Sequence, residues 1–279
     1  MKKKYEFVGA TKEHNGRTLH RIRAIKNFGV VKYGMLGGWI EHEGNLSHTG
    51  NCWVSDGAMV YDQAIVKDNA RVSGRAEVYG TACVAVDAHV DNDAKVYGYA
   101  KVVGKATICG TAHVLERAYV AGTAYVGSAA RVFGSARVEE HAYVLGCAKV
   151  YGNAVLLNDV SIKDDASVYG CAVVKGTACV RGYACVGGDA LIEGLAVIFG
   201  DAQISSTDHF MVVGPIGSRA AYTHFSRRKD GKIQVYCGCF RGTLDEFRAK
   251  VVKTHGENKH AKNYLLAADL AEAQIAPLA

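Results

Sequence analysis

Histidine is the residue type in this chain best suited to acid–base chemistry near neutral pH, and the sequence contains 11 of them. His89, His113 and His141 lie within its long central segment. A histidine acts as a general base when it is held in position beside the proton it removes, and a carboxylate often orients its ring. No carboxylate is identifiably placed to orient any of the three. His113 and His141 are candidate catalytic residues, in competition with the simpler interpretation that they are surface histidines.

Cysteine and histidine could instead bind a metal ion. Cys237-Gly-Cys239 is one close pair, and His255 and His260 form another. A structural zinc site almost always uses four ligands, and neither pair has two more at a recognisable spacing. We therefore expect no metal site. The nine cysteines are an odd number without the framework of a small disulfide-rich domain, so we expect reduced thiols and a cytoplasmic location.

A six-residue repeat must position the central histidines, and it runs from about residue 50 to residue 205. Counting in sixes from Ala58 to Ala202 gives 25 positions, of which all but one are Ala. Counting in sixes from Val54 to Ile204 gives 26 positions, all Val, Ile or Leu. The two sets lie two residues apart, so their side chains point to the same side of a short extended segment. A strict period of this kind predicts a solenoid, whose repeats bury their apolar face by stacking.

The hexad resembles the hexapeptide repeat of left-handed β-helix proteins. That resemblance implies left-handed winding and three hexads in each triangular coil. The expected fold class is therefore an all-β solenoid, a left-handed parallel β-helix of eight to nine coils, about 40 Å long. Every inward position is apolar, which predicts a packed interior without room for a ligand. Any function must then lie on the outer surface or at the ends.

The flanking segments read as an N-terminal cap and a small C-terminal domain. We divide the chain into an N-terminal β-hairpin cap (1–49), the β-helix (50–205) and a C-terminal ββαα, or α+β, domain (206–279). In the cap, two strands at 5–9 and 18–25 flank the hairpin signal Asn15-Gly16. In the C-terminal domain we expect a linker at 214–219, strands at 221–225 and 232–237, a helix opened by a capping box at Thr243, and a second helix at about 259–274.

Four segments carry a closer resemblance, to the YdcK-type β-solenoid proteins of bacteria and their phages, which are described as acyltransferase-like. The resemblance spans residues 1 to about 205 and implies no particular functional residue. The segments are Tyr5-Glu-Phe7-Val-Gly9, Arg17-Thr-Leu-His-Arg-Ile-Arg23, Leu36-Gly-Gly-Trp-Ile-Glu41 and Asn51-Cys-Trp-Val54.

Residues 18 apart should lie directly above one another on the outside of such coils. One column is aromatic except for Leu115, and it is either a ladder that stabilises a flat sheet or a binding face or subunit interface. Its aromatic members are Tyr61, Tyr79, Tyr97, Phe133, Tyr151 and Tyr169. A second outward apolar set is Val155, Leu157, Val173 and Leu191.

The net charge of +6 is concentrated in the flanking segments. Residues 1–49 carry +5, the repeats −3 and residues 206–279 +4. Nucleic-acid binding needs a basic stripe along one face, so the acidic repeats argue against it. No apolar stretch reaches membrane-spanning length, the start of the chain does not resemble a signal peptide, and we expect no membrane contact. The C-terminal residues Arg219, Arg227, Arg228 and Arg241 are candidates for binding an anionic partner.

Two functions fit these observations. The first is a non-catalytic binding or scaffold protein of bacterial or phage origin, without a cofactor. It would be a homo-oligomer, a dimer or trimer, with a possible protein partner at the C-terminal domain. The second is a hexapeptide-class acyltransferase that uses acetyl-CoA or a related donor. The uninterrupted repeat favours the first, and the resemblance to enzymes with this repeat favours the second.

Overall fold

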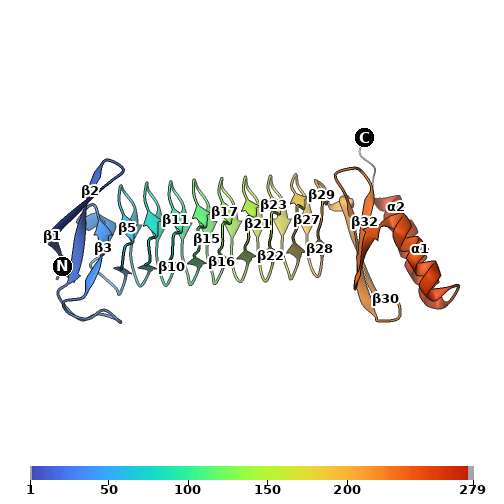
Figure 1. The fold of residues 1–279 in the computed structure, drawn as a ribbon, viewed down its shortest axis with the longest axis horizontal. Coiled ribbons are helices and arrows are strands. Elements are labelled where there is room, and N and C mark those ends of the chain that lie inside the picture. The colour runs from blue at the N-terminus through green and yellow to red at the C-terminus, as the bar shows by residue number, and fades with distance from the viewer. Residues whose placement is uncertain (1, 276–279) are drawn as a thin grey trace.

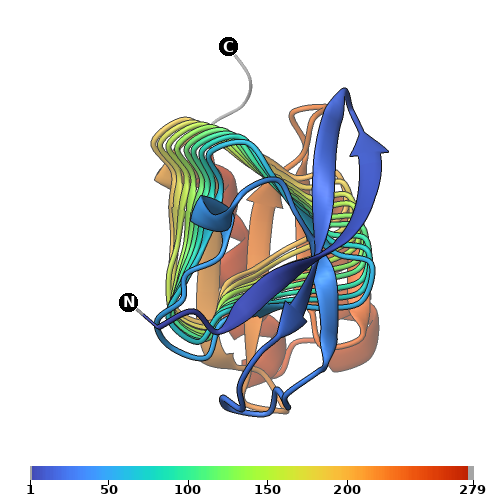
Figure 2. The ribbon, with the colours of Figure 1, turned by 90° about the vertical axis from the view of Figure 1, so that its left-hand side faces the viewer.

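The computed structural model describes residues 2–275, and its central segment is a parallel β-solenoid of about nine turns (Figure 1). Each hexad contributes one two-residue strand, and three successive strands complete a coil of 18 residues. The coils have a rounded triangular outline when seen along the axis (Figure 2). Their strands stack into three parallel sheets, which we name sheets I, II and III. The predicted β-solenoid is therefore confirmed.

The strands of the solenoid are distributed over the three sheets as follows. Sheet I contains β5 (Met59–Val60), β8 (Glu77–Val78), β11 (Lys95–Val96), β14 (His113–Val114), β17 (Arg131–Val132), β20 (Lys149–Val150), β23 (Ser167–Val168), β26 (Cys185–Val186) and β29 (Gln203–Ile204). Sheet II contains β4 (Trp53–Val54), β7 (Arg71–Val72), β10 (His89–Val90), β13 (Thr107–Ile108), β16 (Tyr125–Val126), β19 (Tyr143–Val144), β22 (Ser161–Ile162), β25 (Cys179–Val180) and β28 (Val197–Ile198). Sheet III contains β6 (Ile65–Val66), β9 (Cys83–Val84), β12 (Lys101–Val102), β15 (Tyr119–Val120), β18 (Arg137–Val138), β21 (Val155–Leu156), β24 (Val173–Val174) and β27 (Leu191–Ile192).

The interior is filled by the two apolar sets of the repeat. Every residue counted in sixes from Ala58 and from Val54 is buried, and together they form one continuous core. Alanine is small enough to fit where the coil narrows at a corner, while Val, Ile or Leu fills the space between strands. This packing leaves the outer surface and the two ends as the places where a partner can bind.

The corners of the coils turn through residues with positive φ. Glycine occupies many of them, because it adopts this conformation without a Cβ clash. Asp, Asn or Glu occupies most of the others, and at most of these positions its side chain accepts a hydrogen bond from the next coil. Asp164 Oδ2, for example, accepts from the backbone N–H of Gly182 at 3.0 Å. Ser128 and Val86 are the exceptions, and Val86 is a β-branched residue at φ +63°.

At the strand ends and turns, the backbone N–H groups of each coil donate to the C=O groups of the next coil. The N–H of Lys95 donates to the C=O of Ala112, and the N–H of Tyr97 donates to the C=O of Val114, each at 2.9 Å. The same relation repeats along the solenoid. The first coil is therefore left mainly with free carbonyl oxygens and the last mainly with free N–H groups, so the two ends need caps of different chemical character.

The N-terminal cap is built from β1 (Tyr5–His14), β2 (Arg17–Ala24), β3 (Leu36–Ile40) and a short 3₁₀ turn η1 (Glu43–Asn45). The predicted hairpin is present and longer than expected, and it extends sheet I in the order β1-β2-β3-β5. Because β3 pairs in parallel with β5, coil stacking begins before residue 50. The cap supplies donors. Lys4 Nζ donates to Cys52 O at 2.8 Å, and Asn45 Nδ2 donates to Ala64 O at 2.9 Å.

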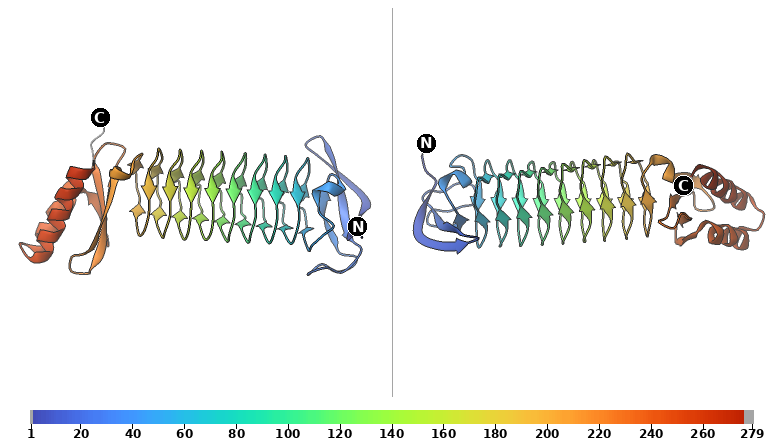
Figure 3. Two further views of the ribbon diagram at one scale, coloured as in Figure 1. Left: turned by 180° about the vertical axis from the view of Figure 1, so that it is seen from behind. Right: turned by 90° about the horizontal axis from the view of Figure 1, so that it is seen from above.

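The C-terminal domain contains a four-stranded antiparallel sheet, sheet IV, and two helices. Its elements are η2 (Thr207–His209), β30 (Phe210–Ile216), β31 (Ala221–Arg227), β32 (Ile233–Cys237), β33 (Phe240–Thr243), α1 (Leu244–His255) and α2 (Lys259–Gln274). Sheet IV lies between the last coil and the helices (Figure 3). The α+β character and both helices are confirmed. The ββαα expectation is incomplete, because Gly214 and Pro215 belong to β30 rather than to a linker and β33 is a further strand.

Sheet IV and η2 supply acceptors to the last coil. His224 Nδ1 accepts from the N–H of Val197 at 3.1 Å, and His209 Nδ1 accepts from the N–H of Ser205 at 3.1 Å. Thr207 Oγ1 accepts from a third free N–H of this coil, at 3.0 Å. A histidine nitrogen accepts only when it carries no proton. Both histidines are therefore neutral in the folded protein.

Candidate functional site

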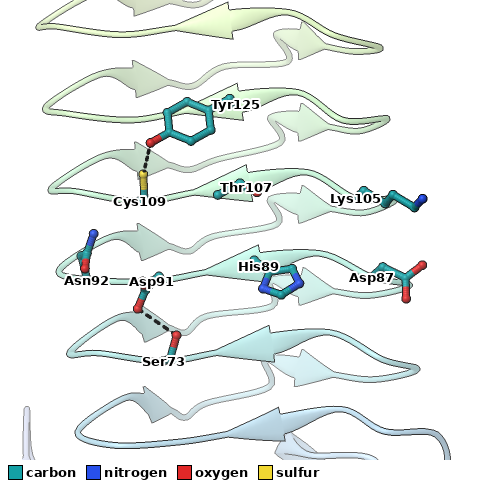
Figure 4. Close-up of a pocket in the computed structure, with 9 residues that line it drawn as sticks. All are labelled: Ser73, Asp87, His89, Asp91, Asn92, Lys105, Thr107, Cys109 and Tyr125. Atoms are coloured by element: carbon teal, nitrogen blue, oxygen red, sulfur yellow. Dashed lines mark hydrogen bonds between the residues drawn. The ribbon is translucent and has the colours of Figure 1, made fainter. Parts of the chain in front are cut away.

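A groove crosses the outer face of sheet II over successive coils, with a volume of about 660 Å³ (Figure 4). Its floor is a column of outward side chains from β10, β13 and β16, namely His89, Thr107 and Tyr125. The spacing of 18 residues places these side chains one above another, because each coil contains three hexads. Ser73, Asp87, Asp91, Asn92, Lys105 and Cys109 form the sides.

Most of the polar side chains in this groove already have partners. Asp91 Oδ1 accepts from Ser73 Oγ at 2.8 Å, and Asp87 Oδ1 accepts from Asn69 Nδ2 at 3.1 Å. Cys109 Sγ and Tyr125 Oη share a hydrogen bond of 2.7 Å, which together with burial raises the pKa of Tyr125. The exposed His89 ring pairs with no carboxylate among residues 2–275. The groove offers hydrogen-bonding groups but no general base with an orienting carboxylate.

The groove continues towards the N-terminal cap, where its wall becomes apolar. A second hollow of about 420 Å³ shares Ser73 and His89 with the first and is lined by the loop before β3. Val30 and Met35 of that loop and Leu36, the first residue of β3, are 62%, 45% and 53% exposed. The two hollows form one elongated depression, which we call the sheet II groove. It is polar at one end and apolar at the other.

His113 lies on sheet I, between Lys95 and Arg131 on the coils before and after it. Burial lowers its pKa, and the positive charges of Arg131 and Lys95 lower it further. Its Nδ1 atom is buried without a hydrogen-bond partner in the described structure. The ring is therefore neutral at pH 7. It stands between two cations, and no carboxylate orients it.

His141 is exposed at the corner before β19. Its Nδ1 lies 3.9 Å from Asp159 Oδ1, which is the residue 18 positions further on. That separation is too long for a hydrogen bond. His89, His113 and His141 stand on different parts of the coil, and the structure brings no two of them together.

The aromatic column forms two runs of stacked rings on the corner that follows sheet I. The centroid of the Tyr79 ring lies 5.0 Å from that of Tyr61 and 4.7 Å from that of Tyr97, and the ring is nearly parallel to both. The centroid of the Tyr151 ring lies 4.9 Å from that of Phe133 and 5.3 Å from that of Tyr169.

Stacking hides the faces of the inner rings, so this column presents mainly ring edges to solvent. Tyr61 is only 3% exposed, and its hydroxyl donates to Glu77 Oε2 at 2.9 Å. The tip of the β1–β2 hairpin covers this region, with His14 Nε2 also 3.1 Å from Glu77 Oε2. The expectation that Tyr61 belongs to an exposed binding face is therefore wrong. The other five rings are partly exposed.

The four candidate arginines do not form one anion site. Arg227 is 6% exposed and points to Ser205 Oγ at 3.4 Å, so it belongs to the contact between β31 and the last coil. Arg228 pairs with Asp201 at 3.3 Å and with Asp230 at 3.5 Å. Arg241 stacks on the Tyr236 ring at 5.4 Å. Arg219 is exposed and, like the exposed Arg241, makes no ion pair with any residue between 2 and 275.

Sequence reasoning missed the residues that close the solenoid ends, Lys4, His209 and His224. Their only sequence signal is a polar residue next to the first or last hexad, which many surface residues share. Burial lowers the pKa of Lys4, although contact with Cys52 opposes this, and burial lowers the pKa of His224 to about 4. All nine cysteines are free thiols. Within residues 2–275, no three His, Cys, Asp or Glu side chains are grouped to hold a metal ion.

No known family model matches this chain, and no curated protein matches it. None of the helices between residues 2 and 275 combines the length and apolar character needed to cross a lipid bilayer.

Proposed function

We propose that this protein is a non-catalytic binding or scaffold protein of bacterial or phage origin, which acts in the cytoplasm as a dimer or trimer. The observation that carries the proposal is the solenoid itself. Its interior is completely filled from β4 to β29, and no loop interrupts its coils. A rigid rod of this kind offers its partners only an outer surface. The sheet II groove, with parts of about 660 Å³ and 420 Å³, is the concave region of that surface that we propose as the binding site.

The sheet II groove suits an extended protein segment. It runs across β4, β7, β10, β13 and β16, which at about 4.8 Å per strand is about 19 Å along the axis. A stretch of about six extended residues has that length. The apolar wall at Val30, Met35 and Leu36 would receive apolar side chains, while the polar floor around His89 would pair with peptide groups.

Self-association is proposed through the second run of the aromatic column, Phe133, Tyr151 and Tyr169, together with the neighbouring apolar residues of sheet III. Val155, Val173 and Leu191 stand side by side on that sheet and are partly exposed. Two copies related by a twofold axis would bury both sets in one contact.

Changing Phe133 and Tyr151 together to Lys tests this interface. We expect the particle mass measured by light scattering to fall to that of one chain, because apolar burial is lost and like charges meet across the contact. The β-rich circular dichroism should stay unchanged, since the core is untouched. The matched control is Thr123→Lys with Thr177→Lys, which adds the same charge at a different corner and should leave the mass as it is. An unaltered mass in the Phe133 and Tyr151 variant excludes this face.

An acyltransferase of the hexapeptide-repeat class is the second candidate, in line with the resemblance to YdcK-type proteins. It is favoured by the size of the sheet II groove, which falls within the range of small-molecule sites. Acetyl-CoA should then raise the melting temperature in a saturable way. We expect no such rise. A rise that is lost on changing His89, His113 or His141 to Ala would replace the binding proposal by the enzymatic one.

A further inference from the structure

The C-terminal domain contains a small pocket of about 180 Å³, far from the sheet II groove. It lies between α1 and the turn that joins β32 to β33. Phe240, Phe247 and Val251 give it an apolar floor. A cavity of about 150 Å³ is large enough for benzene, so one ring or a short alkyl group fits here.

The rim of this pocket is positively charged. Arg219 enters from the segment before β31, and Lys250 and His255 enter from α1. No Asp or Glu lines the pocket. Neither Arg219 nor Lys250 forms an ion pair within residues 2–275, whereas Arg248 on the same helix pairs with both Asp269 and Glu272 at 2.7 Å.

Tyr264 of α2 closes one side of the pocket. Its ring packs at 5.7 Å from the rings of Phe247 and His255. Its hydroxyl lies against Gly217, where a Cβ would stand only 1.7 Å from Tyr264 Oη. Glycine at 217 is therefore needed for this tyrosine to take its place. The wall is fixed by packing before any ligand arrives.

We infer that this pocket binds a carboxylate attached to an apolar group of about the size of a benzene ring. The apolar floor takes the ring or alkyl group, and Arg219 and Lys250 hold the carboxylate at the rim. Inorganic anions would gain only the rim contacts. A free aryl or alkyl carboxylate and the C-terminal residue of a peptide share this chemistry. The site does not depend on the function proposed for the solenoid.

Isothermal titration of the full chain tests the inference with probes of known structure. The probes are 3-phenylpropanoate, its neutral amide, inorganic phosphate, and the peptide acetyl-Gly-Gly-Phe with a free or an amidated carboxyl end. We expect each carboxylate to bind at least about tenfold more tightly than its amide, because a hydrogen bond to a charged group is lost. Tighter binding of the peptide identifies a protein C-terminus as the source, and equal or tighter binding of phenylpropanoate identifies a small acid.

Two pairs of variants locate the binding. Arg219→Gln and Lys250→Gln should each weaken carboxylate binding by about tenfold. Arg241→Gln, which removes an arginine outside the pocket, and Lys253→Gln, one turn along α1, should leave it unchanged. Both pocket residues are exposed, so their variants should fold, and circular dichroism checks this. The assignment is overturned if acid and amide bind equally, or if phosphate binds as tightly as the carboxylates. It is also overturned if the pocket variants and the control variants have equal effects, or if no probe binds.

Discussion

Acid should loosen the contact between the C-terminal domain and the last coil, because that contact depends on neutral histidines. His224 Nδ1 accepts from the N–H of Val197 and is only 6% exposed. Burial lowers its pKa from an ordinary value of 6.5 to about 4. A proton on this nitrogen would face the N–H of Val197 and abolish the bond. The pKa of His209 is lowered as well, by burial and by the charge of Arg227, although Asp208 opposes the shift.

The direction of the effect follows from proton binding. The unfolded or undocked His224 takes up a proton as pH falls through 6.5, whereas the docked residue takes one up only as pH falls to about 4. Docking is therefore fully stable above pH 6.5 and loses stability as pH falls between these values. From pH 6.5 to pH 5 the loss from His224 alone is about 1.6 kcal/mol, or about 15-fold in the docking equilibrium. This window lies above the ordinary pKa of Asp and Glu, so carboxylates contribute little.

Hydrogen exchange measured by mass spectrometry gives the required readout. After correction for the intrinsic rates, protection of the segment around Val197 should fall by about 15-fold between pH 6.5 and pH 5. His224→Gln keeps a side-chain acceptor without a titrating group, so its protection should change much less with pH, leaving the smaller contribution of His209. An NMR titration that places the pKa of His224 near 6.5, or equal pH dependence in the variant and the wild type, would refute the reasoning.

Two further predictions concern the coils. Val86 is 45% exposed and has a β-branched side chain at φ +63°. Val86→Gly should therefore stabilise the protein by about 1 kcal/mol and raise its melting temperature. The same change at Val103, whose φ is not positive, should lower the melting temperature. Val96 is fully buried, so Val96→Asp should cost several kcal/mol of unfolding free energy and unfold neighbouring coils in urea. Lys95→Asp on the outer face should cost far less. A Val96→Asp variant with an unchanged midpoint of urea unfolding would contradict the inward assignment of Val96.

The solenoid could be predicted from the sequence because each coil obeys a local rule. An alternation of inward Ala and Val with outward polar residues identifies the strand, and repetition at a fixed period leaves stacking as the only way to bury the apolar face. The aromatic column followed from the same rule. Its 18-residue spacing gave stacked rings at Tyr79, Tyr97 and Tyr151 without knowledge of any contact.

The features that the sequence did not reveal all depend on contacts between distant segments. The burial of Tyr61 results from the hairpin reaching as far as His14, which no periodicity encodes. The strand β30 contains Gly214 and Pro215, which by themselves suggest a turn, and it forms because β31 offers it a partner. The apolar wall of the sheet II groove comes from a loop without a pattern. The inferred anion site uses Arg219 and Lys250 instead of the predicted row of arginines, because a helix and a turn meet at these two residues.

The polarity of the coils explains why two unlike caps flank a uniform repeat. The first coil exposes mainly carbonyl oxygens and the last mainly N–H groups, and these edges are complementary, so bare solenoids would join head to tail into open fibres. The Lys4 ammonium and the Asn45 amide occupy the first set, and His224, His209 and Thr207 occupy the second. Both ends are thereby closed to further strands. The proposed oligomer therefore uses the sides of the prism, where Phe133, Tyr151 and Tyr169 and the outward valines of sheet III lie.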